Sequence, residues 1–177
     1  VAGTLIAEGQ VSAAHGMASA AILHAYKWDD DIAEMATAYA DDGMRLSNHS
    51  YGFIRGWYYN DTDDNWYWYG DVDISGTEDY LFGFYDAESE RWDSLAYECP
   101  YYTIVKSAGN DRDDVHTGDH FVWWNGGWFP SNATRDRDGG TDGYDCIAEG
   151  GLSKNILTVG AVLQINGGYS APSDVSM

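Results

Sequence analysis

Residues 101–111, YYTIVKSAGND, decide how the rest of the chain is arranged. A short apolar run is followed there by small residues and a Gly-Asn pair, a pattern typical of a strand that ends in a turn. We therefore predict a strand over 101–108 that ends at Gly109 and Asn110. The prediction places Asn110 just beyond the end of a strand.

Short apolar runs and helical segments alternate on both sides of this stretch. Further strands are predicted at 20–28, 44–50 and 156–163, and helices at 1–8, 31–42 and 79–98. This alternation is the pattern of an α/β fold with a mostly parallel sheet flanked by helices. We expect the four strands to form one parallel sheet, with Ser50 and Asn110 at the same carboxyl edge, where open α/β sheets bind ligands.

Two long segments do not follow the alternation. Residues 53–78 are rich in aromatic side chains and aspartate, and residues 111–145 mix charged side chains with Gly, Asn and Trp. Insertions of this length in a compact domain are usually functional loops or surface elaborations. We expect both segments to be long acidic and aromatic insertions of that kind.

Composition limits the class of protein and its partners. A chain of 177 residues with 44% hydrophobic content has the size and apolar content of one domain. The formal net charge of −20 repels nucleic acids and anionic membranes, so we expect neither as a partner. No run of 18 apolar residues predicts a membrane span. The two cysteines, Cys99 and Cys146, allow at most one disulfide, and their spacing indicates neither a zinc site nor a redox pair.

Five short motifs occur in the order and approximate spacing seen in subtilisin-like serine proteases. They are VAGT at 1–4, GMASAAILHAYKW at 16–28, ADDGMRLSNHSYG at 40–52, IVKSAGND at 104–111 and SKNILTVGAV at 153–162. The chain thus resembles that family over most of its length, except for the two long segments. The resemblance implies a subtilisin-like fold and a secreted endopeptidase that hydrolyses polypeptide substrates.

The catalytic triad of the family is not matched. In the family the catalytic histidine lies just before the Val-Ala-Gly-Thr motif, which here begins at Val1. His15 corresponds to a later turn, and Ser19 lacks the residues that precede the nucleophilic serine. We expect residues 1–177 to be part of a peptidase domain, an internal segment between the histidine and serine motifs, and to be inactive alone.

The chain does contain residues that resemble the oxyanion hole and the substrate-binding strands of the family. Asn110 resembles the asparagine whose side-chain amide stabilises the oxyanion formed during peptide hydrolysis. The resemblance also assigns six residues to substrate binding: Ser107, Ala108 and Gly109 in one wall of the specificity pocket, and Ser50, Tyr51 and Gly52 in the strand that pairs with substrate. The alternative is that these residues are ordinary strand ends and that Asn110 is a turn asparagine.

Aspartates cluster in the two long segments. Asp-x-Asp patterns supply the oxygen ligands that calcium prefers, although no EF-hand pattern is complete. The candidate calcium ligands are Asp61, Asp63, Asp64, Asp136, Asp138 and Asp142. Solvated surface charge is the alternative explanation, and the expected calcium would be structural.

Two other functions remain open at this stage. The aromatic stretch at 57–69 would serve a non-catalytic domain that binds a glycan or a protein surface. A stand-alone pseudoprotease would also carry binding elements without the triad.

Overall fold

A computed structural model of the chain describes residues 1–140, 143–163, 165 and 167–175. The chain divides into two compact units, Val1–Met44 and Arg45–Met177.

The first unit contains α1 (Ala2–Ile6), a 3-10 turn η1 (Ser12–Ala14) and α2 (Asp31–Asp41). Both predicted helices are confirmed, although α1 is shorter than expected. Helix α2 buries Met35 and Ala38. It ends where Gly43 adopts a φ of +67°, a left-handed conformation that glycine adopts without strain, so the predicted stop is also correct.

The strand predicted at 20–28 is wrong. These residues adopt no regular secondary structure that continues across them, and every one is exposed, with Ile22 at 88%. A strand is stabilised by hydrogen bonds to a neighbour, and within the described part of the chain no strand pairs with this segment. Its apolar run therefore reflects composition and not burial in a sheet.

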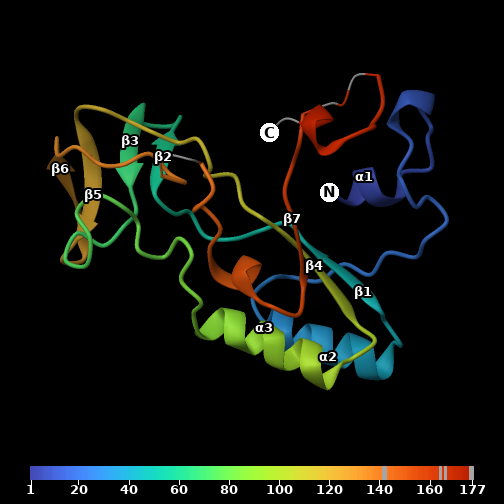
Figure 1. Cartoon of the computed structure of the whole chain (residues 1–177). Helices are drawn as coiled ribbons and strands as arrows, with labels where there is room; N and C mark the ends of the chain where they lie inside the picture. The colour runs from blue at the N-terminus through green and yellow to red at the C-terminus, as the bar shows by residue number, and fades with distance from the viewer. Residues whose placement is uncertain (141–142, 164, 166, 176–177) are drawn as a thin grey trace. The chain divides into compact units, whose positions relative to one another are not determined.

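The second unit contains a parallel sheet of three strands in the order β1-β4-β7 (Figure 1). The strands are β1 (Leu46–His49), β4 (Thr103–Ser107) and β7 (Leu157–Val159). Leu46 pairs with Thr103, and Lys106 of the central strand pairs with Thr158. Three of the four predicted strands and their parallel arrangement are confirmed.

Helix α3 (Ala87–Glu98) begins later than the predicted 79–98. The Asp86 carboxylate caps it by accepting a hydrogen bond from the Ser89 amide at 2.8 Å. The buried Asp79 carboxylate accepts the Gly56 and Leu81 amides instead, which holds the chain before the cap in turns. Trp92 of α3 meets His49 of β1 edge-on, with ring centroids 4.7 Å apart, so the helix packs against the parallel sheet.

A second sheet, in the order β2-β3-β5-β6, is built from the two segments predicted as insertions. Its strands are β2 (Trp57–Asn60), β3 (Asn65–Trp68), β5 (His120–Trp124) and β6 (Gly127–Ser131). Each segment supplies one antiparallel hairpin, and β3 joins β5 in parallel. The two segments are therefore not separate loops, because most of their aromatic residues belong to one shared sheet.

The second sheet has its own core of Trp57, Trp68 and Val122.

Cys99 and Cys146 are both free thiols, and burial raises the pKa of each. None of the described helices is long and apolar enough to cross a membrane.

Candidate functional site

A pocket of about 180 Å³ opens at the carboxyl edge of the parallel sheet. It is lined by three stretches of chain, residues 50–55, 106–111 and 148–149. Because β1 and β4 run in parallel, their carboxyl ends reach the same edge, and the chain then leaves both strands toward the second sheet. The pocket therefore forms where the connections leave the first sheet.

All seven residues assigned by resemblance line this one pocket. Ser50, Tyr51 and Gly52 follow β1, while Ser107, Ala108, Gly109 and Asn110 lie at the end of β4 and beyond it. Gly109 has a φ of +101°, a conformation that side chains with a Cβ rarely adopt. The turn that presents Asn110 therefore depends on glycine.

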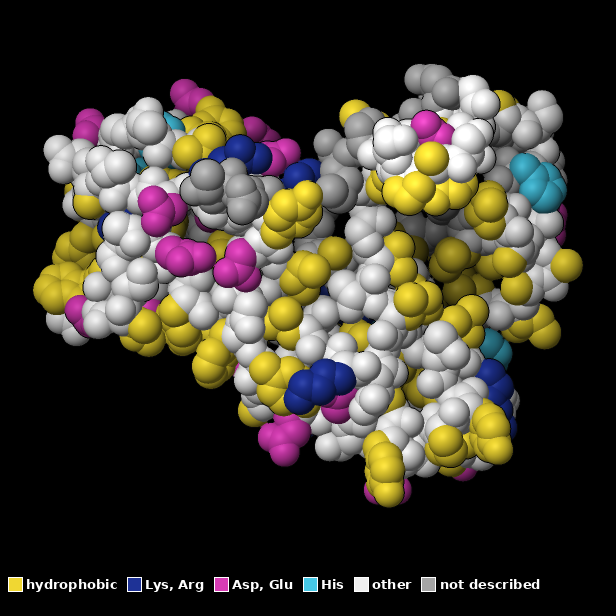
Figure 2. All heavy atoms as spheres, viewed as in Figure 1, with side chains coloured by type: hydrophobic (Ala, Val, Ile, Leu, Met, Phe, Trp, Pro, Cys, Tyr) yellow, Lys and Arg dark blue, Asp and Glu magenta, His cyan; other side chains and the backbone are white. Residues whose placement is uncertain are grey.

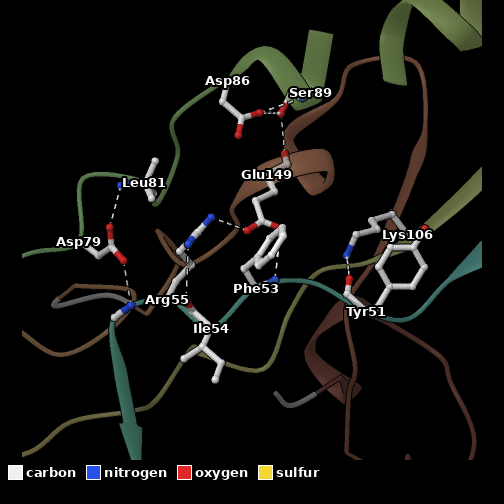
Figure 3. A network of polar contacts seen from close by, with 11 residues as sticks. Tyr51, Phe53, Ile54, Arg55, Asp79, Leu81, Asp86, Ser89, Lys106 and Glu149 are labelled. Atoms are coloured by element: carbon white, nitrogen blue, oxygen red, sulfur yellow. Dashed lines mark hydrogen bonds and ion pairs between the residues drawn. The ribbon is translucent and has the colours of Figure 1, made fainter. Parts of the chain in front are cut away.

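Lys106 joins the two walls of the pocket. Its side chain is buried, and the ammonium donates to the Tyr51 carbonyl at 2.5 Å (Figure 3). The ammonium also donates to the Ser107 carbonyl and hydroxyl at 3.2 and 3.3 Å. Burial lowers the pKa of Lys106, and the nearby Glu149 carboxylate opposes that shift. A charged group in a strand interior thus fixes the position of the segment that follows β1.

Glu149 forms the opposite side of the pocket. It begins the 3-10 turn η2 (Glu149–Leu152), and its carboxylate pairs with Arg55 at 2.5 Å. Its main-chain carbonyl accepts the Ser89 hydroxyl at 2.6 Å, which ties the turn to the start of α3. Burial raises the pKa of Glu149, while Arg55, the Phe53 amide and Lys106 act against this rise.

Gly52 lies between these two charged groups. A Cβ at this position would stand 3.6 Å from the Glu149 carboxylate and 3.8 Å from the Lys106 ammonium. A larger side chain at Gly52 would therefore fill the space between the Glu149 carboxylate and the Lys106 ammonium.

Asp111 carries the strongest electrostatic perturbation among the pocket residues. Burial and the Asp114 carboxylate raise the pKa of Asp111 to about 6, although main-chain amides and Arg55 favour its charged form. Behind it, burial raises the pKa of Asp138 to about 8, with contributions from Asp114, Asp111 and Asp79. The pocket thus adjoins carboxylates that repel one another.

His49 and Ser47 do not form a nucleophile and general base within the pocket. His49 hydrogen-bonds to Ser47 at 2.7 Å and to the Tyr51 hydroxyl at 2.6 Å, but neither His49 nor Ser47 lines the pocket. Its ring packs against Trp92, as expected for a structural histidine. His15 is an exposed loop residue that contacts the Gly16 carbonyl.

Several residues of the pocket were not identified from the sequence. They are Phe53, Ile54, Arg55, Lys106, Asp111, Ala148 and Glu149. A lysine within the otherwise apolar strand was a usable signal for Lys106, since a buried lysine needs a partner. The sequence around Glu149 contains no comparable signal.

The candidate calcium ligands that the structure describes do not converge. Asp63 and Asp64 are exposed at the β2–β3 turn and accept hydrogen bonds from the Tyr67 and Tyr59 hydroxyls, respectively. Asp61 and Asp136 are also exposed, Asp138 is buried against the Trp57 amide, and Asp142 lies outside the described residues. No three His, Cys, Asp or Glu side chains could hold a metal ion together in the part of the chain that the structure describes.

Searches of protein-family models, curated proteins and solved structures return no match to this chain.

Proposed function

We propose that the pocket is the substrate-binding and oxyanion half of a subtilisin-like serine endopeptidase. One observation carries the proposal. Seven residues assigned from two separate motifs of the resemblance, one before and one after a long segment, line a single pocket at the carboxyl edge of a parallel sheet. Adjacent parallel strands end at the same edge of a sheet, and the support for the proposal is that the residues of both motifs line one pocket there.

In the proposed mechanism a polypeptide lies along residues 50–52 and places one side chain in the pocket. Small residues at 107–109 leave room for that side chain. The Asn110 amide then donates a hydrogen bond to the oxygen that becomes negative when the peptide carbonyl is attacked. A donor that is already oriented stabilises this charge without reorganising during the reaction.

Residues 1–177 contain none of the motifs that carry the family's aspartate, histidine and nucleophilic serine. An oxyanion donor without a nucleophile has no intermediate to stabilise. The chain alone is therefore proposed to be inactive, and activity belongs to a protein that also supplies the triad. Secretion of that protein and a structural calcium ion are part of the same proposal.

The test compares residues 1–177 with a longer product of the same coding region. The chain alone should hydrolyse no casein and should not react with a fluorophosphonate probe. Flanking sequence should encode an aspartate and a His-Gly-Thr-His motif upstream, and a Gly-Thr-Ser-Met-Ala motif downstream. Flanking sequence without these motifs, or probe-sensitive proteolysis by residues 1–177, would contradict the proposal.

A further inference from the structure

One face of the second sheet is covered by aromatic rings. Side chains alternate between the two faces of a strand, so partners in the register Tyr58–Tyr67, Tyr67–Phe121 and Trp123–Trp128 share one face. Tyr69 continues the alternation beyond β3. We call this set of side chains the aromatic face; its members are Tyr58, Tyr67, Tyr69, Phe121, Trp123 and Trp128.

The rings of the aromatic face contact one another across the strands. Trp128 meets Tyr67, Tyr69 and Trp123 edge-on, with ring centroids 4.8, 4.9 and 5.3 Å apart. Tyr67 and Phe121 stack at 5.4 Å. The rings therefore form a continuous surface and are not isolated exposed residues.

The aromatic face does not build the core of the sheet. That core, Trp57, Trp68 and Val122, lies on the opposite face. On the aromatic face Tyr58 is 37% exposed and Trp123 is 46% exposed. Figure 2 shows hydrophobic side chains gathered at the left, where Figure 1 places β5 and β6. The other four members of the aromatic face are half-buried. A partly exposed aromatic surface that lies outside the core is typical of a binding site.

Charge restricts the possible occupant. The strand positions on this face carry no Asp, Glu, Lys or Arg, and the register pair Asn60–Asn65 extends it toward the turn with amide groups. The turn itself is acidic, and the Tyr67 hydroxyl donates to Asp63. With a net charge of −20, the chain repels anionic partners and also a second copy of itself.

Because the rings lie on the face of a sheet, this surface suits a saccharide ligand better than a polypeptide ligand. The main-chain groups between paired strands are used within the sheet, so a peptide lying on the face would leave its own amides and carbonyls unpaired. A sugar ring instead offers C–H groups to the negative faces of aromatic rings. Its hydroxyls point sideways, toward water and toward donors and acceptors at the rim.

We propose that the aromatic face binds a neutral polysaccharide. This site is separate from the pocket and does not depend on the proposed protease function. Trp123 and Trp124 offer a matched pair of variants, because they are neighbours in β5, 46% and 44% exposed, and point to opposite faces. The Trp124 indole donates to Asp73 on the other side of the sheet.

The experiment measures retention of residues 1–177 on microcrystalline cellulose, chitin and starch, with heparin-agarose as an anionic comparison. The protein should bind at least one neutral polysaccharide and should not bind heparin. Trp123→Ala should weaken this binding at least tenfold, while Trp124→Ala should change it less than twofold. Circular dichroism checks that both variants are folded.

Three outcomes would overturn the proposal: no retention on any of the neutral polysaccharides, equal losses in the two variants, or Trp123-dependent self-association or casein binding without polysaccharide binding. Trp123→Phe provides a second variant if Trp123→Ala does not fold, and it should retain most of the binding because the ring remains. None of these outcomes depends on peptide hydrolysis, so failure here is distinguishable from failure of the protease proposal.

Discussion

The two sheets of the second unit use different interactions and present different surfaces. The parallel sheet brings the ends of β1 and β4 to one edge and joins them there by a buried lysine that donates to main-chain carbonyls. The mixed sheet is held by pairs of aromatic rings on both faces. Parallel strands collect polar residues at a common edge, whereas hairpins distribute their side chains over faces. The first sheet therefore positions a pocket, and the second presents a surface.

The largest effect on stability is expected from Trp68→Ala, which tests whether the second sheet is stabilised mainly by aromatic packing. Trp68 is fully buried, and Arg135 stacks on its ring at 3.9 Å. Removing the ring should lower the free energy of unfolding by about 3–5 kcal/mol. Chemical denaturation measures this loss, and Trp68→Phe should cost clearly less. If Trp68→Ala reduced hydrogen-exchange protection equally in both sheets, that result would contradict the claim that the two sheets are stabilised by different interactions.

A smaller effect is expected from Lys106→Met, which removes the link between the pocket walls but keeps the apolar stem. The Tyr51 carbonyl would lose its 2.5 Å donor, and such losses cost about 1–3 kcal/mol. Lys154 is the matched control, because it is exposed and its ammonium lies over Tyr85. Lys154→Met should stay within about 0.5 kcal/mol of the parent. Equal effects in the two variants would show that Lys106 does not brace the pocket.

The pH dependence of stability tests the buried carboxylate beside the second sheet. With a pKa of about 8, Asp138 keeps a proton in the folded state that the unfolded chain releases near its ordinary value of about 3.9. Its contribution to stability is therefore lost as the pH rises from about 4 to 8. Asp138→Asn should match the parent near pH 4 and exceed it by at least about 1 kcal/mol at pH 8.

Thermal or chemical unfolding across this range gives the difference directly. Asp136→Asn is the control, since Asp136 is exposed two residues away. A stability difference between Asp138→Asn and the parent that stays constant with pH would remove Asp138 as the titrating group.

The smallest effect is expected from calcium, which would act on the acidic turns of the second sheet and not on the pocket. At 1 mM calcium, a site with a dissociation constant of about 10⁻⁴–10⁻³ M stabilises by about 0.4–1.4 kcal/mol. The melting temperature should therefore be higher in calcium than in chelator at equal ionic strength. Equal melting temperatures would argue that the aspartates only carry surface charge.

The parallel sheet could be predicted because its signals are local. Each strand is a short run bounded by turn residues, and Gly109 and Asn110 mark the end of β4. The same reasoning failed at 20–28, where an apolar run has no partner strand among the described residues. The start of α3 was also predicted too early. Apolar spacing suggested a longer helix, but the Asp86 carboxylate caps α3 and fixes its start.

The second sheet was missed because its central pairing, β3 with β5, joins distant parts of the chain. One local signal was present. Asn125 and Gly126 separate two aromatic runs and have φ values of +50° and +81°, as in the tight turn of a hairpin. The charged pairs of the pocket, Arg55 with Glu149 above all, depend on the same long-range folding and could not be inferred from spacing.

The most direct test of the central claim is turnover by an Asn110→Ala variant of a protein that contains this chain and the full triad. We expect kcat to fall by about 10²–10³, the effect known for loss of the oxyanion-hole asparagine of subtilisin and so not an independent magnitude. KM should change little, because the interaction forms mainly in the transition state. The exposed Asn132→Ala variant should retain full turnover. Near-normal kcat for Asn110→Ala would contradict the assignment of this pocket as an oxyanion site.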